Sequence, residues 1–215
     1  MTDLPSARRR MVERQLRRRG IEDERVLAAM GEVPREAFLP EALRDRAYAD
    51  SALPIGEEQT ISQPWIVAAI CQALELEGSE LVLEVGTGSG YSAAVLARLA
   101  AHVVSIERHQ PLSREAAAVL DSLGVRNVEI VVGDGSLGVP ARAPFDAIAV
   151  HAAAPAAPLA LIEQLAAAGR LVIPISAGRD ADVLTLLRRT EDRVETIDLG
   201  PCRFVPLIGA EGFDE

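Results

Sequence analysis

Three glycines at alternate positions, Gly86, Gly88 and Gly90, follow an apolar run at 81–85 and precede a helical pattern. Glycine lets the backbone approach a ligand closely, and the start of the following helix presents unpaired N–H groups. Glu107 ends the next apolar run, about 20 residues past the loop, where a carboxylate can accept hydrogen bonds from both hydroxyls of a ribose. The loop and Glu107 together predict a site for a ligand of nucleoside size.

The spacing of the glycines narrows the choice of ligand. The dinucleotide fingerprint is G-x-G-x-x-G, but this chain reads G-x-G-x-G and has Tyr91 where the third glycine of the fingerprint would fall. A phosphate-binding Lys-Ser/Thr pair is also absent. A nucleoside cofactor without a diphosphate is therefore favoured, and S-adenosylmethionine (SAM) fits that description. The alternative is that the glycines only make a tight turn and that Glu107 is a solvated strand end.

Two more polar segments follow apolar runs further along the chain. In Gly133-Asp134-Gly135, the aspartate can accept a hydrogen bond from an adenine amino group, or the three residues can form an ordinary turn. His151 follows the run at 145–150 and stands where a catalytic base could lie, or where a strand-end side chain binds the backbone. The small residues at 152–154 leave room for a substrate.

These segments need a framework that brings them together, and the chain from residue 81 onward provides one by alternating apolar runs with helical patterns. The expected strands are 81–85, 102–106, 127–132, 145–150 and 170–175, and the expected helices are 90–99, 111–123 and 157–167. Two last strands, 182–188 and a segment within 193–208, have no helix between them. The pattern predicts an α/β fold: a doubly wound, mostly parallel seven-stranded, Rossmann-like sheet with an antiparallel C-terminal edge. Ligands of such sheets bind beyond the carboxyl ends of the strands, where the polar segments converge.

Residues 1–78 are expected to form helices and loops that act as a lid over the core at 79–215, within one domain of 215 residues. A helix at 65–76 is expected to have Pro64 in its first turn and Ser62 as its N-cap. The Arg-rich helix at 6–19 has a thin apolar edge. It is interpreted as a solvated helix that docks by this edge, with a targeting or anion-binding segment as the alternative.

Composition excludes several classes of protein. The net charge of −10 argues against a general nucleic-acid binder, and all 22 basic residues are arginine, which excludes lysine chemistry. Cys71 and Cys202 form no disulfide framework, and the three histidines lack the spacing of a metal site. Neither a signal-peptide core nor an apolar run of 18 residues is present. We therefore expect a cytoplasmic monomer without metal or membrane partner.

Five motifs taken together resemble the protein-L-isoaspartate O-methyltransferase family, from Met11 to about Gly209. They are residues 84–91, Pro54-Ile55-Gly56 with Gln59 to Pro64, residues 133–135, residues 152–155, and Arg203 to Leu207. The Gln-Thr-Ile-Ser-Gln-Pro block is far more specific than the glycine loop. The resemblance implies a SAM-methyltransferase sheet with its last two strands exchanged in order. It also implies methyl transfer from SAM to the free α-carboxylate of L-isoaspartyl residues in damaged proteins and peptides, followed by collapse of the ester to a succinimide.

The resemblance makes Ser62 the active-site residue, with Thr60 nearby. Candidate cofactor-binding residues are Ile61, Gln63, Glu84, Gly86, Thr87, Gly88, Ser89, Gly90, Glu107, Arg108, Asp134 and Gly135. Candidate substrate-binding residues are Ile55, Gln59, His151 and Val205. The segment that contains Val205 could pair with an extended peptide or be an ordinary edge strand. His151 stands where the family more commonly has threonine or glycine, which leaves fine substrate preference open.

Other functions use the same sheet. One is a carboxyl or hydroxyl O-methyltransferase that acts on a small molecule or on one dedicated peptide. A second is a non-catalytic SAM-binding protein, against which the complete Thr60 and Ser62 block argues. An NAD-linked oxidoreductase is disfavoured by Tyr91. Methyl transfer to a carboxylate requires no general base, because a carboxyl group with a pKa near 4 is already ionised at pH 7.

Overall fold

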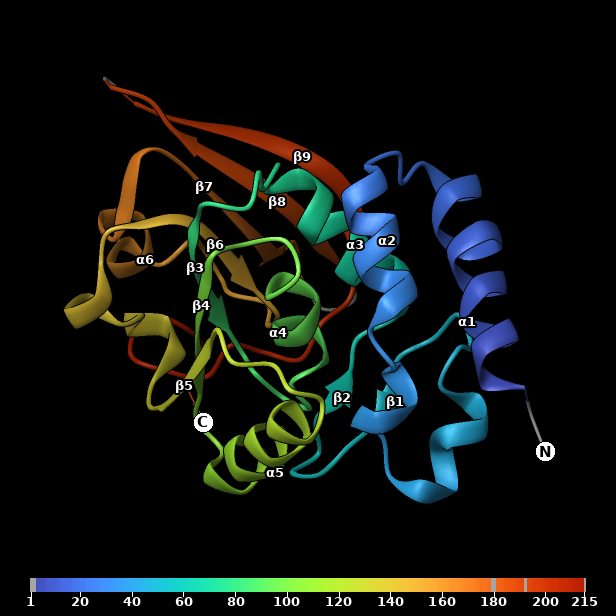
Figure 1. Ribbon diagram of the computed structural model, residues 1–215. Coiled ribbons are helices and arrows are strands. Elements are labelled where there is room, and N and C mark those ends of the chain that lie inside the picture. The colour runs from blue at the N-terminus through green and yellow to red at the C-terminus, as the bar shows by residue number, and fades with distance from the viewer. Residues whose placement is uncertain (1–2, 179–180, 192, 215) are drawn as a thin grey trace.

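The computed structural model describes residues 3–178, 181–191 and 193–214. Its centre is a 7-stranded sheet in the order β5-β4-β3-β6-β7-β8-β9 (Figure 1). The strands are β3 (Leu81–Val85), β4 (His102–Glu107), β5 (Val128–Val132), β6 (Phe145–Val150), β7 (Leu165–Ser176), β8 (Asp182–Arg189) and β9 (Val194–Cys202). The neighbouring strands from β5 to β7 in this order pair in parallel. Strand β8 pairs antiparallel with both of its neighbours, β7 and β9. The predicted doubly wound sheet with an antiparallel edge is confirmed.

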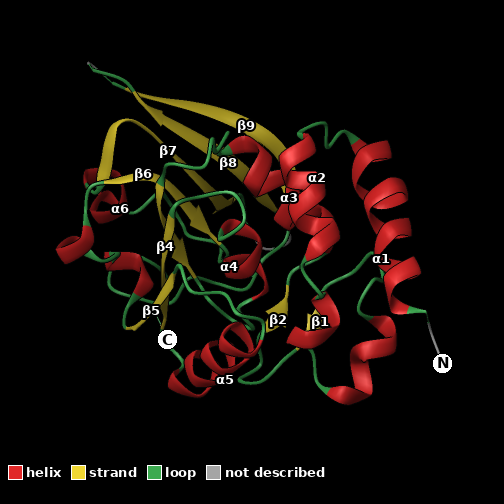
Figure 2. Ribbon diagram, viewed as in Figure 1, coloured by secondary structure: helices red, strands yellow, loops and turns green. Residues whose placement is uncertain are grey.

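Helices cover both faces of the sheet (Figure 2). They are α3 (Pro64–Ala73), α4 (Tyr91–Leu96), α5 (Gln110–Ser122) and α6 (Leu159–Glu163). Successive side chains of a strand point to opposite faces, so Val82 and Leu83 of β3 enter two different buried clusters. The Val82 cluster packs under α3 and α4, and the Leu83 cluster packs against α6.

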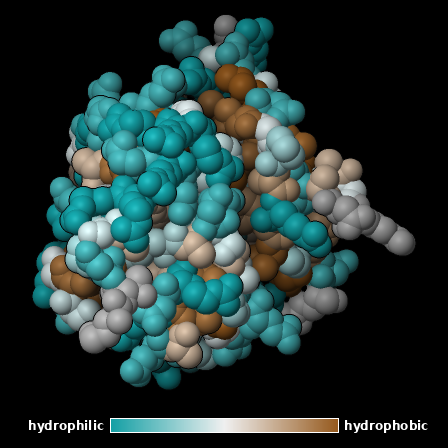
Figure 3. All heavy atoms as spheres, turned by 90° about the vertical axis from the view of Figure 1, so that its right-hand side faces the viewer, coloured by the Kyte–Doolittle hydropathy of each residue, from teal (hydrophilic) through white to brown (hydrophobic). Residues whose placement is uncertain are grey.

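The N-terminal segment is helical and shares the core of the sheet. Helix α1 (Leu4–Met11) continues through a π-helical stretch, Val12–Leu16, and a 3₁₀ turn, Arg17–Arg19, before α2 (Glu24–Glu32). Met11, Val12 and Leu16 are buried in the same cluster as Val82, so the Arg-rich helix docks by its apolar edge. Hydrophilic side chains cover most of this side of the molecule, and hydrophobic ones form only a narrow band and scattered spots (Figure 3).

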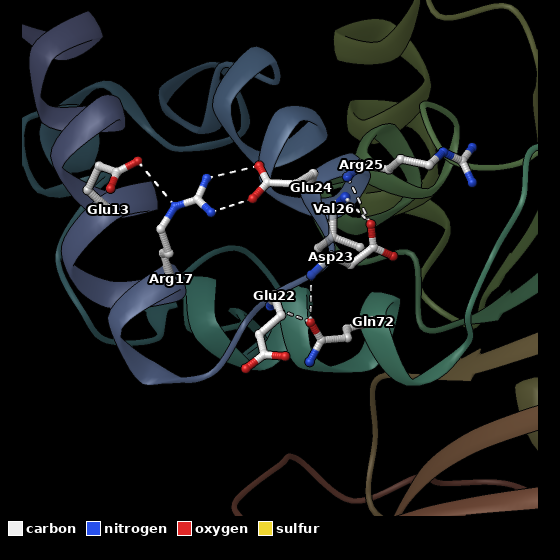
Figure 4. A network of polar contacts seen from close by, with 8 residues as sticks. All are labelled: Glu13, Arg17, Glu22, Asp23, Glu24, Arg25, Val26 and Gln72. Carbon is white, nitrogen blue, oxygen red and sulfur yellow. Dashed lines mark hydrogen bonds and ion pairs between the residues drawn. The ribbon is translucent and has the colours of Figure 1, made fainter.

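Polar contacts join the N-terminal helices to α3 (Figure 4). The Gln72 side-chain oxygen accepts hydrogen bonds from the backbone N–H groups of Glu22 at 2.7 Å and Asp23 at 3.0 Å. Asp23 in turn caps α2 by accepting from the N–H groups of Arg25 and Val26. Arg17 pairs with Glu24 and Glu13 at the surface. These bonds fix the angle at which α2 begins, and so hold its apolar face on the core.

The segment before α3 differs from the sequence-based prediction in two ways. Residues 47–64, expected to be loop, contain a small antiparallel pair, β1 (Leu53–Pro54) with β2 (Thr60–Ile61). The N-cap of α3 is Gln63, which makes no side-chain capping bond, so the prediction that Ser62 caps this helix is wrong. Pro64 does occupy the first turn, as predicted, and its missing N–H lessens the need for a cap.

The prediction of a helix over 157–167 is also wrong at its C-terminal half. Helix α6 ends at Glu163, and β7 begins at Leu165, which pairs with Phe145 of β6. Three alanines favour helix by intrinsic propensity, but here they lie in a strand. Ala168 adopts φ of +61° and the pairing register shifts between Phe145 and Ala147, so this stretch contains an irregularity.

Short 3₁₀ turns complete the chain: Arg35–Phe38, Glu41–Arg46, Gly135–Leu137 and Pro140–Arg142. Within the described ranges, no helix is long and apolar enough to cross a membrane.

Candidate active site

The glycine loop connects β3 to α4 in the backbone conformation that its glycines allow. Gly86 and Gly90 have φ of +92° and +87°, in the left-handed region that side chains disfavour. A Cβ atom on Gly90 would lie 3.1 Å from the Cβ of Ala116 in α5, so glycine also lets the loop pack closely there. Gly90 is the N-cap of α4, and the loop therefore leads directly to the start of that helix.

Glu107, at the tip of β4, faces this loop. Its carboxylate is buried and accepts hydrogen bonds from the backbone N–H groups of Gly88 at 2.9 Å and His109 at 3.0 Å. Each carboxylate oxygen can accept more than one hydrogen bond, so capacity remains for a ligand. The two bonds fix the carboxylate beside the loop, as a ribose-binding role requires.

The loop after β5 approaches the floor of the same region. A Cβ atom on Gly135 would lie 2.6 Å from Val85 Cγ1, so only glycine lets this backbone lie against β3. Asp134 accepts from Ser136 N–H at 2.9 Å, Ser136 Oγ at 2.7 Å and Ala210 N–H at 2.8 Å. The aspartate thus ties the C-terminal tail to this loop, and it lines a separate shallow depression with Arg108.

A cavity of about 920 Å³, including the space open at its mouth, lies beyond the carboxyl ends of the strands. Most of the predicted site residues line it: Gln59, Thr60, Ile61, Ser62, Gly86, Thr87, Gly88, Ser89, Glu107, Arg108, Gly135, His151 and Val205. We call it the cofactor cavity.

Five predicted residues lie outside this lining: Ile55, Gln63, Glu84, Gly90 and Asp134. Ile55 packs beside the loop, because its Cδ1 would lie 3.6 Å from a Cβ on Gly88. Gln63 donates a hydrogen bond to the Asp50 carboxylate at 2.7 Å. Glu84 is fully buried beneath the cavity floor.

A second hollow meets the cofactor cavity at Thr60, Ser62, His151 and Val205, which line both. We call it the acceptor cleft. The rest of its wall comes from the N-terminal segment and the chain after β9, including Arg19, Asp50, Trp65, Arg203 and Phe204. Arg19 pairs with Asp50 at 2.9 Å and lies 5.0 Å from the centre of the Trp65 ring.

The hydroxyls of Thr60 and Ser62 make no hydrogen bond with any residue in the described part of the chain. Serines elsewhere in the site differ: Ser92, Ser105 and Ser136 use their hydroxyls within the protein. Because Ser62 does not cap α3, its hydroxyl is available to a ligand at the junction of the two hollows.

Beneath the junction, Glu84 and His151 are buried as neighbours, with 3.5 Å between Glu84 Oε1 and His151 Nε2. Burial raises the pKa of Glu84 to about 8 and lowers the pKa of His151 to about 4. Both effects have the same cause, which is that a charged form is disfavoured away from water. Near pH 7, both groups are therefore uncharged.

Several lining residues were not predicted from the sequence: Val67, Ser92, His109, Ala152, Pro206, Leu207 and Ile208. Ser92 follows the glycine loop by two residues, at a position that begins the helix, and that placement could have indicated it. Leu207 and Ile208 belong to the segment that returns from β9, whose path depends on tertiary packing. Leu207 is held by a backbone hydrogen bond to Ala153 at 2.7 Å.

A parallel sheet whose first strand leads through a glycine loop to a helix, with an acidic residue at the tip of the next strand, defines the class of nucleoside-binding α/β proteins. The sequence profile of the protein-L-isoaspartate(D-aspartate) O-methyltransferase family matches residues 7–212. The chain belongs to this family.

Curated relatives match along almost the whole chain. A protein-L-isoaspartate O-methyltransferase 1 of Rhodopseudomonas palustris (strain HaA2) is 55% identical over 213 residues, which are 99% of this chain and 87% of the relative. A protein-L-isoaspartate O-methyltransferase of Methanoculleus marisnigri is 54% identical over 206 residues, covering 96% of this chain and 93% of the relative.

Two solved structures share the fold closely. One, a protein-L-isoaspartate O-methyltransferase, is 31% identical with a TM-score of 0.84, covering 95% of this chain and 67% of its own. The other, described as a protein-L-isoaspartate O-methyltransferase from Plasmodium falciparum in complex with S-adenosyl-L-homocysteine, is 25% identical with a TM-score of 0.81. That match covers 97% of this chain and 99% of the other.

Proposed function

We propose that the chain transfers a methyl group from SAM to the free α-carboxylate of L-isoaspartyl residues in damaged proteins and peptides. The ester then collapses to a succinimide, and part of it reopens as normal aspartate, which makes the transfer the first step of a repair. The observation that carries the proposal is the junction at which the two hollows share Thr60 and Ser62. Both hydroxyls are unengaged where a cofactor and an acceptor would meet.

The residues of the cofactor cavity fit SAM. The loop of Gly86 and Gly88 leaves space for a close backbone approach, and Glu107 offers its carboxylate to a ribose. Gly135 also lines the cavity, and its missing side chain lets the backbone lie against Val85. Asp134 lies outside this lining, in the depression that shares Arg108 and Ile208 with the cavity; its carboxylate already accepts three hydrogen bonds but retains acceptor capacity for an amino group. When bound, SAM supplies a methyl group on a positively charged sulfur, which is strongly electrophilic.

The protein's part in the reaction is to orient the acceptor and to exclude water. Thr60 and Ser62 donate hydrogen bonds that turn one carboxylate oxygen toward the methyl donor. Hydroxyls suit this task, since an arginine would bind the carboxylate more tightly but make it less nucleophilic. The buried side chains of Ile61 and Leu207 line the cofactor cavity and limit the access of water, and orientation with desolvation can lower a barrier by several kcal/mol.

The acceptor cleft suits an extended peptide. On one edge of the segment after β9, Val205 and Leu207 already pair with the backbone of Ala153. Phe204 and Pro206 lie on the opposite edge, and the Phe204 N–H is bound by Asp182 at 2.8 Å. We therefore expect a peptide to donate its N–H groups to the Phe204 and Pro206 carbonyls. Recognition through the main chain would accept many flanking sequences.

We also propose that residues 1–78 form a lid within a single domain of residues 1–215, because buried side chains of both parts belong to one cluster. We expect a monomer, which gel filtration tests. The two free cysteines suit a reducing compartment, so we propose a cytoplasmic location, which cell fractionation tests.

The decisive experiment is transfer of a tritiated methyl group from SAM to paired peptides that differ only in L-isoaspartate or L-aspartate. The expected product is a base-labile ester, which releases methanol, on the isoaspartyl peptide alone. Absence of that label would reject the proposed function. Label on a small carboxylic acid, or on one dedicated peptide at a normal aspartate, would support the alternative O-methyltransferases instead.

A further inference from the structure

A row of buried polar side chains lies beneath the junction of the cofactor cavity and the acceptor cleft. His151 Nε2 lies 2.7 Å from Ser92 Oγ and 3.5 Å from Glu84 Oε1. Ser105 Oγ lies 2.5 Å from Glu84 Oε2, and also 2.5 Å from Thr87 Oγ1. Hydrogen bonds thus join His151, which lines both hollows, to Ser92, and they join Glu84 through Ser105 to Thr87 in the glycine loop. Between His151 and Glu84 there is only the 3.5 Å approach, because Glu84 Oε1 makes no hydrogen bond.

The fold explains why these residues meet. Glu84 and Ser105 are register partners on β3 and β4, so their side chains share one face of the sheet. Helix α4 lies over that face, and Ser92 is in its first turn. His151 follows β6, the other neighbour of β3, and its backbone N–H bonds to the Val85 carbonyl at 2.9 Å. Three adjacent strands and one helix thus converge on the imidazole.

Ser92 is the group that holds the ring of His151. Among the described residues, its hydroxyl makes the one hydrogen bond to that ring, because His151 Nδ1 is buried without a partner and Glu84 Oε1 is equally unpartnered. A buried polar atom without a partner is costly, so the orientation that keeps the Ser92 bond is strongly preferred. Without this hydroxyl, the ring would keep only its 3.5 Å approach to Glu84 Oε1, which makes no hydrogen bond in this structure.

We propose that Ser92 is a positioning residue that fixes His151 at the junction and thereby sets the shape of the acceptor cleft. The inference rests on the proposed function, since it concerns how the acceptor is received. It predicts a larger effect on acceptor affinity than on cofactor affinity, because Ser92, which itself lines the cofactor cavity, holds a side chain that forms a wall of the acceptor cleft.

The charge state of the ring agrees with this role. The titratable groups that face these buried polar side chains are Glu84 from β3, Glu107 from β4 and Cys71 from α3, and they add no positive charge. Burial lowers the pKa of His151 to about 4, so the imidazole is neutral when an anionic acceptor arrives. A neutral ring forms a wall without pairing with the carboxylate, which keeps the carboxylate reactive.

The kinetic test compares Ser92→Ala with Ser92→Thr, which keeps the hydroxyl. We expect Ser92→Ala to raise KM for an isoaspartyl peptide at least five-fold, and to change kcat and the Kd of SAM, whose cavity Ser92 also lines, by a smaller factor. Ser92→Thr should remain within two-fold of the wild type in all three. Ser122→Ala is the matched control, because that hydroxyl is exposed and bonds only to Val119 of its own helix. An unchanged peptide KM in Ser92→Ala would overturn the proposal.

A double-mutant cycle tests whether Ser92 acts through His151. In a His151→Ala background, the further change Ser92→Ala should alter peptide KM by less than 1.5-fold. A second five-fold increase would mean that Ser92 acts by another route, and would overturn the proposal. If Ser92→Ala lowers thermal stability too far, Ser92→Cys keeps nearly the same size with a weaker hydrogen bond. We expect it to raise peptide KM by an intermediate factor.

A third measurement does not depend on activity. The chain has 3 histidines, so the imidazole ¹⁵N resonances can be assigned with His151→Ala as reference. Ser92→Ala should shift the ring resonances of His151 and leave those of His102 and His109 in place. Unshifted His151 resonances would overturn the inference even in an active enzyme. Conversely, the wild-type protein could fail to methylate isoaspartyl peptide while Ser92→Ala still shifts the His151 resonances. That result would reject the proposed function and leave the role of Ser92 standing.

Discussion

The inner part of the cofactor cavity and its junction with the acceptor cleft differ in whether their polar groups are already bonded. On the cofactor side, Glu107 accepts two backbone N–H groups and the Thr87 hydroxyl bonds to Ser105. On the acceptor side, the hydroxyls of Thr60 and Ser62 are unbonded within the described residues. The cofactor groups are therefore fixed before a ligand arrives, whereas the acceptor groups remain available.

This difference matches the demands of the proposed reaction. The cofactor is one molecule of constant shape, so a rigid site binds it with little loss of conformational freedom. The acceptor is one carboxylate in many possible surroundings, so the cleft needs a few free donors and a tolerant wall. Mutations of the unbonded hydroxyls should therefore change mainly kcat, and mutations of the bonded cofactor groups should change mainly the Kd of SAM.

The largest separation is expected for Ser62→Ala. Loss of an orienting donor that acts on the reacting carboxylate should lower kcat on the order of 100-fold. The Kd of SAM should stay within two-fold, since Ser62 bonds to nothing on the cofactor side. Steady-state kinetics and calorimetry measure the two quantities, with Ser122→Ala as control. An equal loss of SAM affinity would mean that Ser62 binds the cofactor, and would contradict its assignment to the acceptor.

Glu107→Ala should have the opposite pattern. Hydrogen bonds to a carboxylate contribute about 1.5–3 kcal/mol, so the Kd of SAM should rise roughly 10- to 100-fold. At saturating SAM, kcat should approach that of the wild type. Calorimetry with S-adenosyl-L-homocysteine gives the affinity without turnover, and Glu115→Ala on the exposed face of α5 is a suitable control. A fall in kcat with unchanged affinity contradicts this assignment.

The pH dependence of the free energy of unfolding tests the protonation of Glu84 and His151, which lie beneath the junction of the two hollows. The raised pKa of Glu84, about 8, removes stability as pH rises from about 4.5 to 8, while the lowered pKa of His151, about 4, adds stability from about 4 to 6.5. The two effects oppose each other below pH 6.5, so the Glu84 effect stands alone from 6.5 to 8. We expect a loss of about 2 kcal/mol there.

Urea unfolding at several pH values measures this loss, and Glu84→Gln should abolish it because an amide does not titrate. A wild-type curve that stays flat between pH 6.5 and 8 would mean that Glu84 is ionised in the folded protein. In that case the floor would carry a charge beneath the cofactor, and the neutral state of His151 would need a different explanation.

A smaller effect is expected at the outer wall of the cofactor cavity. A Cβ atom on Gly209 would lie 2.0 Å from Asp134 Oδ1 and 2.6 Å from Ser136 Oγ, so Gly209→Ala must displace the tail. Ile208 lines the cavity, and we expect SAM affinity to fall about five-fold. Gly31→Ala is the control, because its new Cβ meets only Val12 at 3.8 Å. Equal effects of the two variants would argue against a role for the tail.

The sheet, the glycine loop and the position of Glu107 could be predicted, because apolar strand patterns and glycine-rich loops depend on residues that are close together in the sequence. The contacts of Ser92 with His151 and of Asp134 with Ala210 were not predictable, since they join residues 59 and 76 positions apart. The helix over 157–167 was wrong because alanine propensity gave way to pairing with β6. The cap role of Ser62 was wrong because α3 begins at Pro64, so that the residue directly before it, Gln63, is the N-cap.

The shared core of the N-terminal helices and the sheet has a consequence for motion. Met11 and Leu16 are buried in the same cluster as Val82 of β3, so the N-terminal helices cannot leave the sheet without exposing the protein's interior. Their slowest amide hydrogens should therefore exchange with solvent only when the whole chain unfolds, at the same free energy as those of β3. The N-terminal helices are then a fixed part of the core rather than a hinged segment. Adaptation to different damaged sequences must come from side chains at the rim.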